Sequence, residues 1–233
     1  MCEAAGMREP AAAHADLIGR LMGIDVSALS DADKSLPVVD PAVRAMLPDV
    51  RIAGPALTVL AEADHLPVFA ALDEAQPGEV LVVATGGAGV AVSGELFATE
   101  AGRRGVAGLV VDGYVRDLQG LRRAGLPVFA RGTTPRSGSV RSRAALRAPI
   151  VCGGVAVTPG DLVFADDDGV LIAPAAQVAA ALETAEAIAR AERAMLERVR
   201  AGTASLHDLT TFREHVAALD AGRDSALAFT VDA

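Results

Sequence analysis

Three polar residues have the types needed for chemistry on small organic acids: Glu95 and the adjacent pair Arg116 and Asp117. Carboxylates are the ligands that hard cations such as Mg²⁺ and Mn²⁺ prefer. An arginine suits a substrate carboxylate or the negative charge that develops on an enolate oxygen. An Arg-Asp pair is also common as an ordinary surface ion pair beside a helix cap. The residue types alone leave both interpretations open.

A glycine cluster at Gly86, Gly87 and Gly89 is a second candidate. It follows a predicted strand and precedes a predicted helix, where free backbone N–H groups attract anions. Asp112, at the end of the next predicted strand, lies where a dinucleotide-binding fold places its ribose-binding acid. The third glycine of that fingerprint is replaced by Val92, so the signal is weak. A nucleotide-binding enzyme and a plain turn are both alternatives.

The predicted strands decide where these residues meet. Apolar runs predict buried strands at 51–61, 79–84, 108–112 and 127–130. Pro55 places the first of them at an edge or at a strand start. Helical spacing predicts helices at 65–75, 90–104 and 118–124. If the strands ending at Ala84 and Asp112 are parallel neighbours, the polar residues that follow them meet in the crevice where open α/β sheets bind ligands.

The flanking segments predict the fold class. A helix is expected within 11–22, and strands are expected at 151–157 and 162–173, the latter interrupted by a turn at 166–169. An alanine-rich helix at 175–201 ends at Gly202. Alternating strands and helices beside paired strands predict an α/β sandwich with a mixed sheet. No Pro, Gly and Ser-rich linker divides the chain, so we expect a single domain over 1–233.

Composition argues against several function classes. The 233 residues carry 21 Lys and Arg against 30 Asp and Glu, and aromatics are 3%. A net charge of −9 and few stacking side chains argue against nucleic-acid binding and anionic membranes. The longest uncharged stretch, 80–94, is too short for a bilayer span, and the start shows no basic leader. Two cysteines, Cys2 and Cys152, favour a reducing cytoplasm. The single lysine, Lys34, lies in a polar stretch that disfavours imine catalysis.

Several motifs together resemble the RraA-like family, which includes the divalent-metal-dependent 4-hydroxy-4-methyl-2-oxoglutarate aldolases. The matching stretches are 27–32, 94–97, 108–117, 126–130, 159–161 and 165–174. The aldolase signature of that family is an acidic residue, a gap of twenty residues and then Arg-Asp, which Glu95 and Arg116-Asp117 fit. The resemblance covers most of 25–205, and the segment after about 205 is not diagnostic.

The resemblance implies a β/β/α swivelling-domain-like sandwich with a mixed sheet, N-terminal helices and a long C-terminal helix, assembled as trimers or hexamers. It implies that Asp117 ligates Mg²⁺ or Mn²⁺ and that Arg116 contacts the pyruvyl oxygens. It also implies that Glu95 holds a metal-bound water. The backbone amides of Gly94, Glu95, Leu96 and Phe97 would hold the substrate carboxylate.

The implied activity is class II cleavage of a 4-hydroxy-2-oxo acid to pyruvate. Oxaloacetate decarboxylation passes through the same enolate and is an expected second activity. The alternative within the family is a non-catalytic RraA-type regulator that binds a ribonuclease. Those proteins lack the Arg-Asp pair, so its presence here favours the enzyme.

Weaker features remain open. The arginine-rich stretch 118–160 and the glutamates of the 175–201 helix suggest complementary charges within or between subunits. Alternatively, Arg131 or Arg136 binds the distal carboxylate of a dicarboxylic substrate, or Glu192 from a neighbouring subunit enters the site. The four histidines show no metal-ligand spacing, and Asp166 to Asp168 suit a hairpin turn better than a calcium loop.

Overall fold

The computed structural model describes residues 14–142 and 146–230 and shows the expected mixed α/β sandwich. One eight-stranded sheet has the order β1-β6-β5-β3-β2-β9-β10, and β4 pairs with β5 off this path. Its strands are β1 (Arg44–Ala45), β2 (Arg51–Leu60), β3 (Val80–Ala84), β4 (Ala91–Ser93), β5 (Gly108–Val115), β6 (Val128–Thr133), β9 (Leu162–Asp166) and β10 (Gly169–Ala173). A separate hairpin joins β7 (Ile150–Cys152) to β8 (Val155–Val157).

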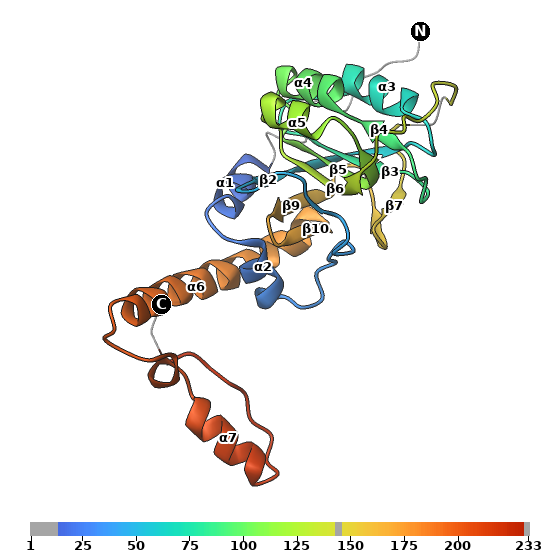
Figure 1. The fold of residues 1–233 in the computed structure, drawn as a ribbon. Coiled ribbons are helices and arrows are strands. Elements are labelled where there is room, and N and C mark those ends of the chain that lie inside the picture. Colours follow the sequence, from blue (N-terminus) through green and yellow to red (C-terminus); the bar gives the residue numbers. More distant parts are fainter. Residues whose placement is uncertain (1–13, 143–145, 231–233) are drawn as a thin grey trace.

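The helices lie in two groups (Figure 1). The first group covers one face of the parallel strands: α3 (Leu66–Glu74), α4 (Glu95–Arg103) and α5 (Leu118–Ala124). The second group gathers around β9 and β10: α1 (Ala15–Leu21), α2 (Val26–Ala32) and the long α6 (Ala175–Arg200). A short 3-10 helix, η2 (Leu206–Leu209), and α7 (Phe212–Asp220) follow α6 and extend away from the sheet. In the described part of the chain, none of the helices has both the length and the apolar character needed to cross a bilayer.

Side chains alternate between the two faces of the sheet along each strand, and both faces are covered. Leu81 and Val83 on β3 pack into the core beneath the first group of helices. Their neighbours Val80 and Val82 pack against the β7–β8 hairpin on the other face. Both faces of β3 are therefore buried, which accounts for its continuously apolar sequence.

Strand β2 connects the two halves of the sheet. Its residues Arg51 to Pro55 pair antiparallel with β9, and residues 56–60 pair parallel with β3. The expected edge position of Pro55 is therefore wrong. The proline lies in an interior strand at the point where β2 changes partner, where its missing N–H is tolerated because one ladder stops as the next begins.

Three further boundaries differ from the expectations. The predicted helix at 90–104 begins only at Glu95, because Ala91–Ser93 forms β4 beside the end of β5. The 151–157 stretch is a hairpin, since Gly153 and Gly154 adopt φ of 52° and 82° and turn the chain. Helix α1 begins at Ala15, and residues 11–13 lie outside the described ranges. The turn expected at 166–169 is confirmed between β9 and β10.

Candidate functional site

The ends of parallel strands bring the predicted residues together. β5 pairs in parallel with β3, which meets the condition set in the sequence analysis, and continues past it to pair with β4. The backbone N–H of Arg116 donates to the carbonyl of Ser93 at 3.0 Å. This contact holds the residues after β5 directly beside the start of α4.

Gly94 is packed too tightly for any side chain. A Cβ at this position would lie 2.6 Å from Asp117 Oδ2 and 2.9 Å from Arg116 Cγ. The next residue, Glu95, donates its backbone N–H to Asp117 Oδ2 at 3.4 Å. The first intrahelical bond of α4 runs from Ala98 N–H to the carbonyl of Gly94. The N–H groups of the first turn of α4 thus point out of the helix at its positive end, which suits an anion such as a carboxylate.

Asp117 itself has an unusual backbone. Its φ and ψ of 60° and 46° are left-handed, a region that non-glycine residues seldom adopt but aspartate tolerates better than most. Its carboxylate lies 3.4 Å from Arg116 Nε, and both side chains are a little under half exposed, at 44% and 42%. A strained, half-exposed carboxylate held between a guanidinium and a helix N-terminus is a typical functional arrangement.

The Arg116-Asp117 pair borders a hollow of about 280 Å³, lined also by Leu118, Thr133, Thr134 and Pro135. A second, water-sized space of about 20 Å³ lies on the other side of Arg116, between His65, Ser93, Phe97 and Ser137. The pair is therefore open to a small ligand.

The Glu95 side chain points away from this pair. Its carboxylate forms a two-pronged ion pair with Arg123 of α5, at 2.9 Å from Nη2 to each oxygen. It also packs so closely on Gly120 that a Cβ there would lie 2.3 Å from Glu95 Oε2. The structure therefore brings Arg116 and Asp117 together with the backbone of Glu95. The metal-bound-water role of the Glu95 carboxylate stays a prediction.

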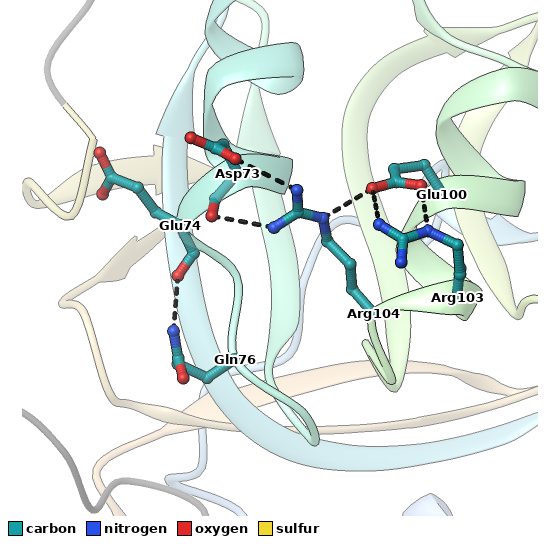
Figure 2. A network of polar contacts seen from close by, with 6 residues as sticks. All are labelled: Asp73, Glu74, Gln76, Glu100, Arg103 and Arg104. Atoms are coloured by element: carbon teal, nitrogen blue, oxygen red, sulfur yellow. Dashed lines mark hydrogen bonds and ion pairs between the residues drawn. The ribbon is translucent and has the colours of Figure 1, made fainter.

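Helix α4 is held in place by ion pairs at its far end (Figure 2). Arg104 donates to Glu100 at 2.7 Å and to the backbone carbonyl and side chain of Asp73 on α3. Hydrogen bonds from Arg103 and then Arg104 lower the pKa of Glu100 to about 2. These contacts fix α4 against α3 and so help to fix its N-terminus beside Asp117.

Among the other predicted residues, Arg131 is already paired. It donates to Asp112 at 2.5 Å and to Asp40 at 2.8 Å, and its role as a distal-carboxylate ligand stays a prediction. Arg136 is exposed, and its carbonyl accepts from the N–H of Ala91 in β4. Its role as a distal-carboxylate ligand stays a prediction. Glu192 lies on α6, which Figure 1 places away from α4 and α5 within one chain.

The glycine cluster does not fit the nucleotide-binding alternative. Gly86 and Gly87 adopt φ of 64° and 80° and turn the chain into β4 rather than into a helix. The phosphate-binding hypothesis requires a helix that starts directly after this loop, and a strand follows it instead. The plain-turn interpretation holds.

The structure describes one of the two cysteines. Cys152 is a free, buried thiol, and burial raises its pKa to about 12. Cys2 lies outside the described residues. Within the described ranges, His, Cys, Asp and Glu do not gather in groups of three or more suited to a metal. The carboxylate that borders the hollow is that of Asp117.

Two residues near the site were missed by the sequence reasoning. The Ser93 hydroxyl is buried in the water-sized space beside Arg116 and has no hydrogen-bond partner among the described residues. Asp64 is 1% exposed and anchors the loop after β6. Its Oδ2 accepts from Ser139 Oγ, Arg141 N–H and Ser142 N–H at 2.5–2.9 Å. Neither a single buried serine nor a single buried aspartate has a spacing signal in the sequence, so only the fold identifies Ser93 and Asp64.

We expect Asp64→Asn to loosen this loop. Burial raises the pKa of Asp64, but hydrogen bonds from Ser139, Arg141, Leu66 and Ser142 outweigh it and lower the pKa overall. A depressed pKa means that the carboxylate stabilises the fold above its unfolded pKa of about 4 and that this contribution is lost in acid. One amide oxygen cannot replace two carboxylate oxygens, so the Arg141 and Ser142 amides should exchange roughly tenfold faster at pH 7.

Hydrogen-exchange mass spectrometry over 134–142 measures this effect. Asp31→Asn is the matched control, because Asp31 is exposed and its ion pair is with Lys34. The difference between Asp64→Asn and the parent should shrink as the pH falls below 4. Equal exchange rates at pH 7 would contradict the anchoring role.

Comparison with known proteins gives the family. Residues 26–172 match the family model described as "RraA-like: Aldolase/RraA". A protein from Halalkalibacterium halodurans named "Putative 4-hydroxy-4-methyl-2-oxoglutarate aldolase" is 35% identical over 176 residues, which cover 75% of this chain and 84% of that protein. A protein of the same name from Burkholderia multivorans is 39% identical over 140 residues, covering 59% of this chain and 85% of that protein.

Solved structures agree with the fold. An uncharacterised protein from Pseudomonas syringae pv. tomato has a TM-score of 0.74 and 27% identity, covering 83% of this chain and 96% of that one. The RNA-processing inhibitor RraA from Thermus thermophilis has a TM-score of 0.59 and 32% identity, covering 64% of this chain and 91% of that one. With its motifs, its topology and a family match over more than half its length, the chain belongs to the RraA-like family.

Proposed function

We propose that this protein is a divalent-metal-dependent aldolase that cleaves 4-hydroxy-4-methyl-2-oxoglutarate, or a related 4-hydroxy-2-oxo acid, to pyruvate. The observation that carries the proposal is the meeting of Arg116, Asp117 and the N-terminus of α4 beside a hollow of about 280 Å³. Relatives named as aldolases of this substrate support it. The non-catalytic alternative is less favoured, because the Arg-Asp pair that it does not need is present and open to a ligand.

The donor set fits Mg²⁺ or Mn²⁺. Asp117 offers one hard carboxylate at the edge of an open hollow. Magnesium keeps several waters and is often held by one or two carboxylates together with its substrate. When bound at Asp117, such an ion supplies Lewis-acid stabilisation of negative charge on the substrate oxygens.

The protein groups each have a distinct task. The N–H groups of the first turn of α4 bind the substrate carboxylate and orient it. The Arg116 guanidinium stabilises the oxygen that gains charge as the C3–C4 bond breaks and pyruvate leaves as its enolate. Oxaloacetate decarboxylation yields the same enolate, so we propose it as a side activity. We also propose that the protein works as a homotrimer or homohexamer.

Removing the metal tests the proposal. After treatment with EDTA and desalting, we expect pyruvate release from 4-hydroxy-4-methyl-2-oxoglutarate to fall at least about 100-fold, since Lewis-acid stabilisation is worth several kcal/mol. Added Mg²⁺ or Mn²⁺ should restore it, whereas Ca²⁺ with its longer bonds should do so poorly. Activity that survives complete metal removal would contradict metal dependence. No turnover of any 2-oxo acid, together with capture of a ribonuclease, would favour the regulator instead.

A further inference from the structure

The hydroxyl of Ser93, the last residue of β4, is buried without a partner. Ser93 is 4% exposed, and its Oγ makes no hydrogen bond to the described residues. Burying an unpaired hydroxyl costs its desolvation, so native structures nearly always pair such a group with protein or with an ordered water. Thr58 on β2 follows this rule, because its buried hydroxyl donates to the carbonyl of Ala148 at 2.7 Å. Ser93 therefore calls for a partner of its own.

The hollow beside Ser93 has the size and the polarity that suit one water molecule. Its volume is about 20 Å³, and a water needs roughly 10–15 Å³ of such space. A buried water also needs at least two polar partners. Four of the residues that line the hollow carry a polar side chain: His65, Ser93, Arg116 and Ser137. The hollow is therefore a water site rather than a site for an organic ligand.

Backbone hydrogen bonds fix the walls of this hollow. The N–H of Arg116 donates to the carbonyl of Ser93 at 3.0 Å, which joins the end of β5 to β4. The N–H of Gly138 donates to the carbonyl of Ala91 at 3.1 Å, which holds the loop after β6 against β4. The N–H of His65 donates to a carbonyl of the same loop at 3.0 Å. Because backbone contacts set its walls, the hollow keeps its shape independently of the side chains.

The Arg116 guanidinium is the group beside the hollow that needs a second anchor. Its ion pair within the described residues is with Asp117, at 3.4 Å from Nε, and its side chain is 42% exposed. Asp117 is also the carboxylate proposed to ligate the metal. A cation bound there attracts the same carboxylate and repels the guanidinium, so the ion pair weakens when the site is loaded. The guanidinium has further N–H donors that can reach an acceptor elsewhere.

We propose that Ser93 is a positioning residue for Arg116 and acts through one ordered water in the hollow. The water accepts a hydrogen bond from the guanidinium and donates one to Ser93 Oγ, so it anchors Arg116 from the side opposite the substrate hollow. This inference rests on the proposed function, in which Arg116 stabilises the enolate oxygen. A charge held in place does so better than a mobile one, because it need not reorient as the negative charge develops.

A crystal structure of the full-length protein, soaked in Mg²⁺ and pyruvate, tests the water site. We expect one ordered water within about 2.7–3.2 Å of both Ser93 Oγ and a guanidinium nitrogen of Arg116. In crystals of Ser93→Ala, this water should be lost and the Arg116 side chain should show raised B-factors. A parent hollow without an ordered water, or a water that contacts Ser93 but not Arg116, would overturn the proposal.

Steady-state pyruvate release tests the positioning role. Ser93→Ala should lower kcat about tenfold and leave KM within about twofold, because the N–H groups of α4 that bind the substrate carboxylate are unchanged. Thr58→Val is the matched control, since it removes another buried strand hydroxyl and should keep the parent kcat. Equal kcat values for Ser93→Ala and the parent would also overturn the proposal. No turnover by the parent would contradict the proposed function itself, and the two failures are distinguishable because the crystal structure reports the water without any activity.

Discussion

Asp117→Asn should lower kcat/KM for aldol cleavage by about 10³-fold, because it removes the carboxylate that we propose as the metal ligand. Asparagine has nearly the same shape and also tolerates the left-handed backbone that Asp117 adopts, so the loop should keep its conformation. The contact from Glu95 N–H can pass to the amide oxygen. The loss should therefore be in function and not in folding.

The measurement is steady-state pyruvate release at saturating Mg²⁺, with thermal unfolding recorded in parallel. Asp49→Asn is a matched control, since Asp49 is also a left-handed aspartate, with φ of 58°, but lies beside Asp167 at the β9–β10 turn. We expect the control to keep the parent activity. If Asp117→Asn keeps its activity as well, Asp117 is not the metal ligand and the proposed mechanism fails.

Arg147→Met should lower the free energy of unfolding by about 3–5 kcal/mol, because it leaves a buried carboxylate without its counter-charge. Glu79 lies just before β3 and is 1% exposed, and Arg147 donates to its two oxygens at 2.7 and 3.0 Å. Methionine preserves most of the length and apolar stem of arginine. Since both are L-residues with a Cβ, the φ of 52° at this position costs the same in both.

Urea unfolding at pH 7 measures the change in the free energy of unfolding. Arg103→Met removes an exposed pair with Glu100 and should leave the urea midpoint close to that of the parent, because solvent screens an exposed ion pair. The double variant Glu79→Leu, Arg147→Met should recover most of the loss, because a hydrophobic pair needs no desolvation of charge. A cost below 1 kcal/mol for Arg147→Met alone would show that Glu79 finds another partner or water.

The sequence was sufficient to predict most of the central secondary-structure elements of this protein. Buried apolar runs and glycine turns predicted strands β2, β3 and β5, the β9–β10 hairpin and the long helix α6. If β3 and β5 are parallel neighbours, Arg116 and Asp117 lie at the carboxyl ends of the strands, and the structure meets this condition. These features depend on local pattern and on the handed, parallel connection of strand, helix and strand, which short-range physics constrains strongly.

Only the tertiary structure decided how the side chains are partnered. Ala91–Ser93 is too short and too uniformly apolar for its period to separate strand from helix, and pairing with β5 made it a strand. Glu95 turned to Arg123, and Arg131 turned to Asp40 and Asp112, because packing brought those charges within reach. A charge pairs with whichever opposite charge the fold places nearest, and that distance is set by elements far apart in the chain.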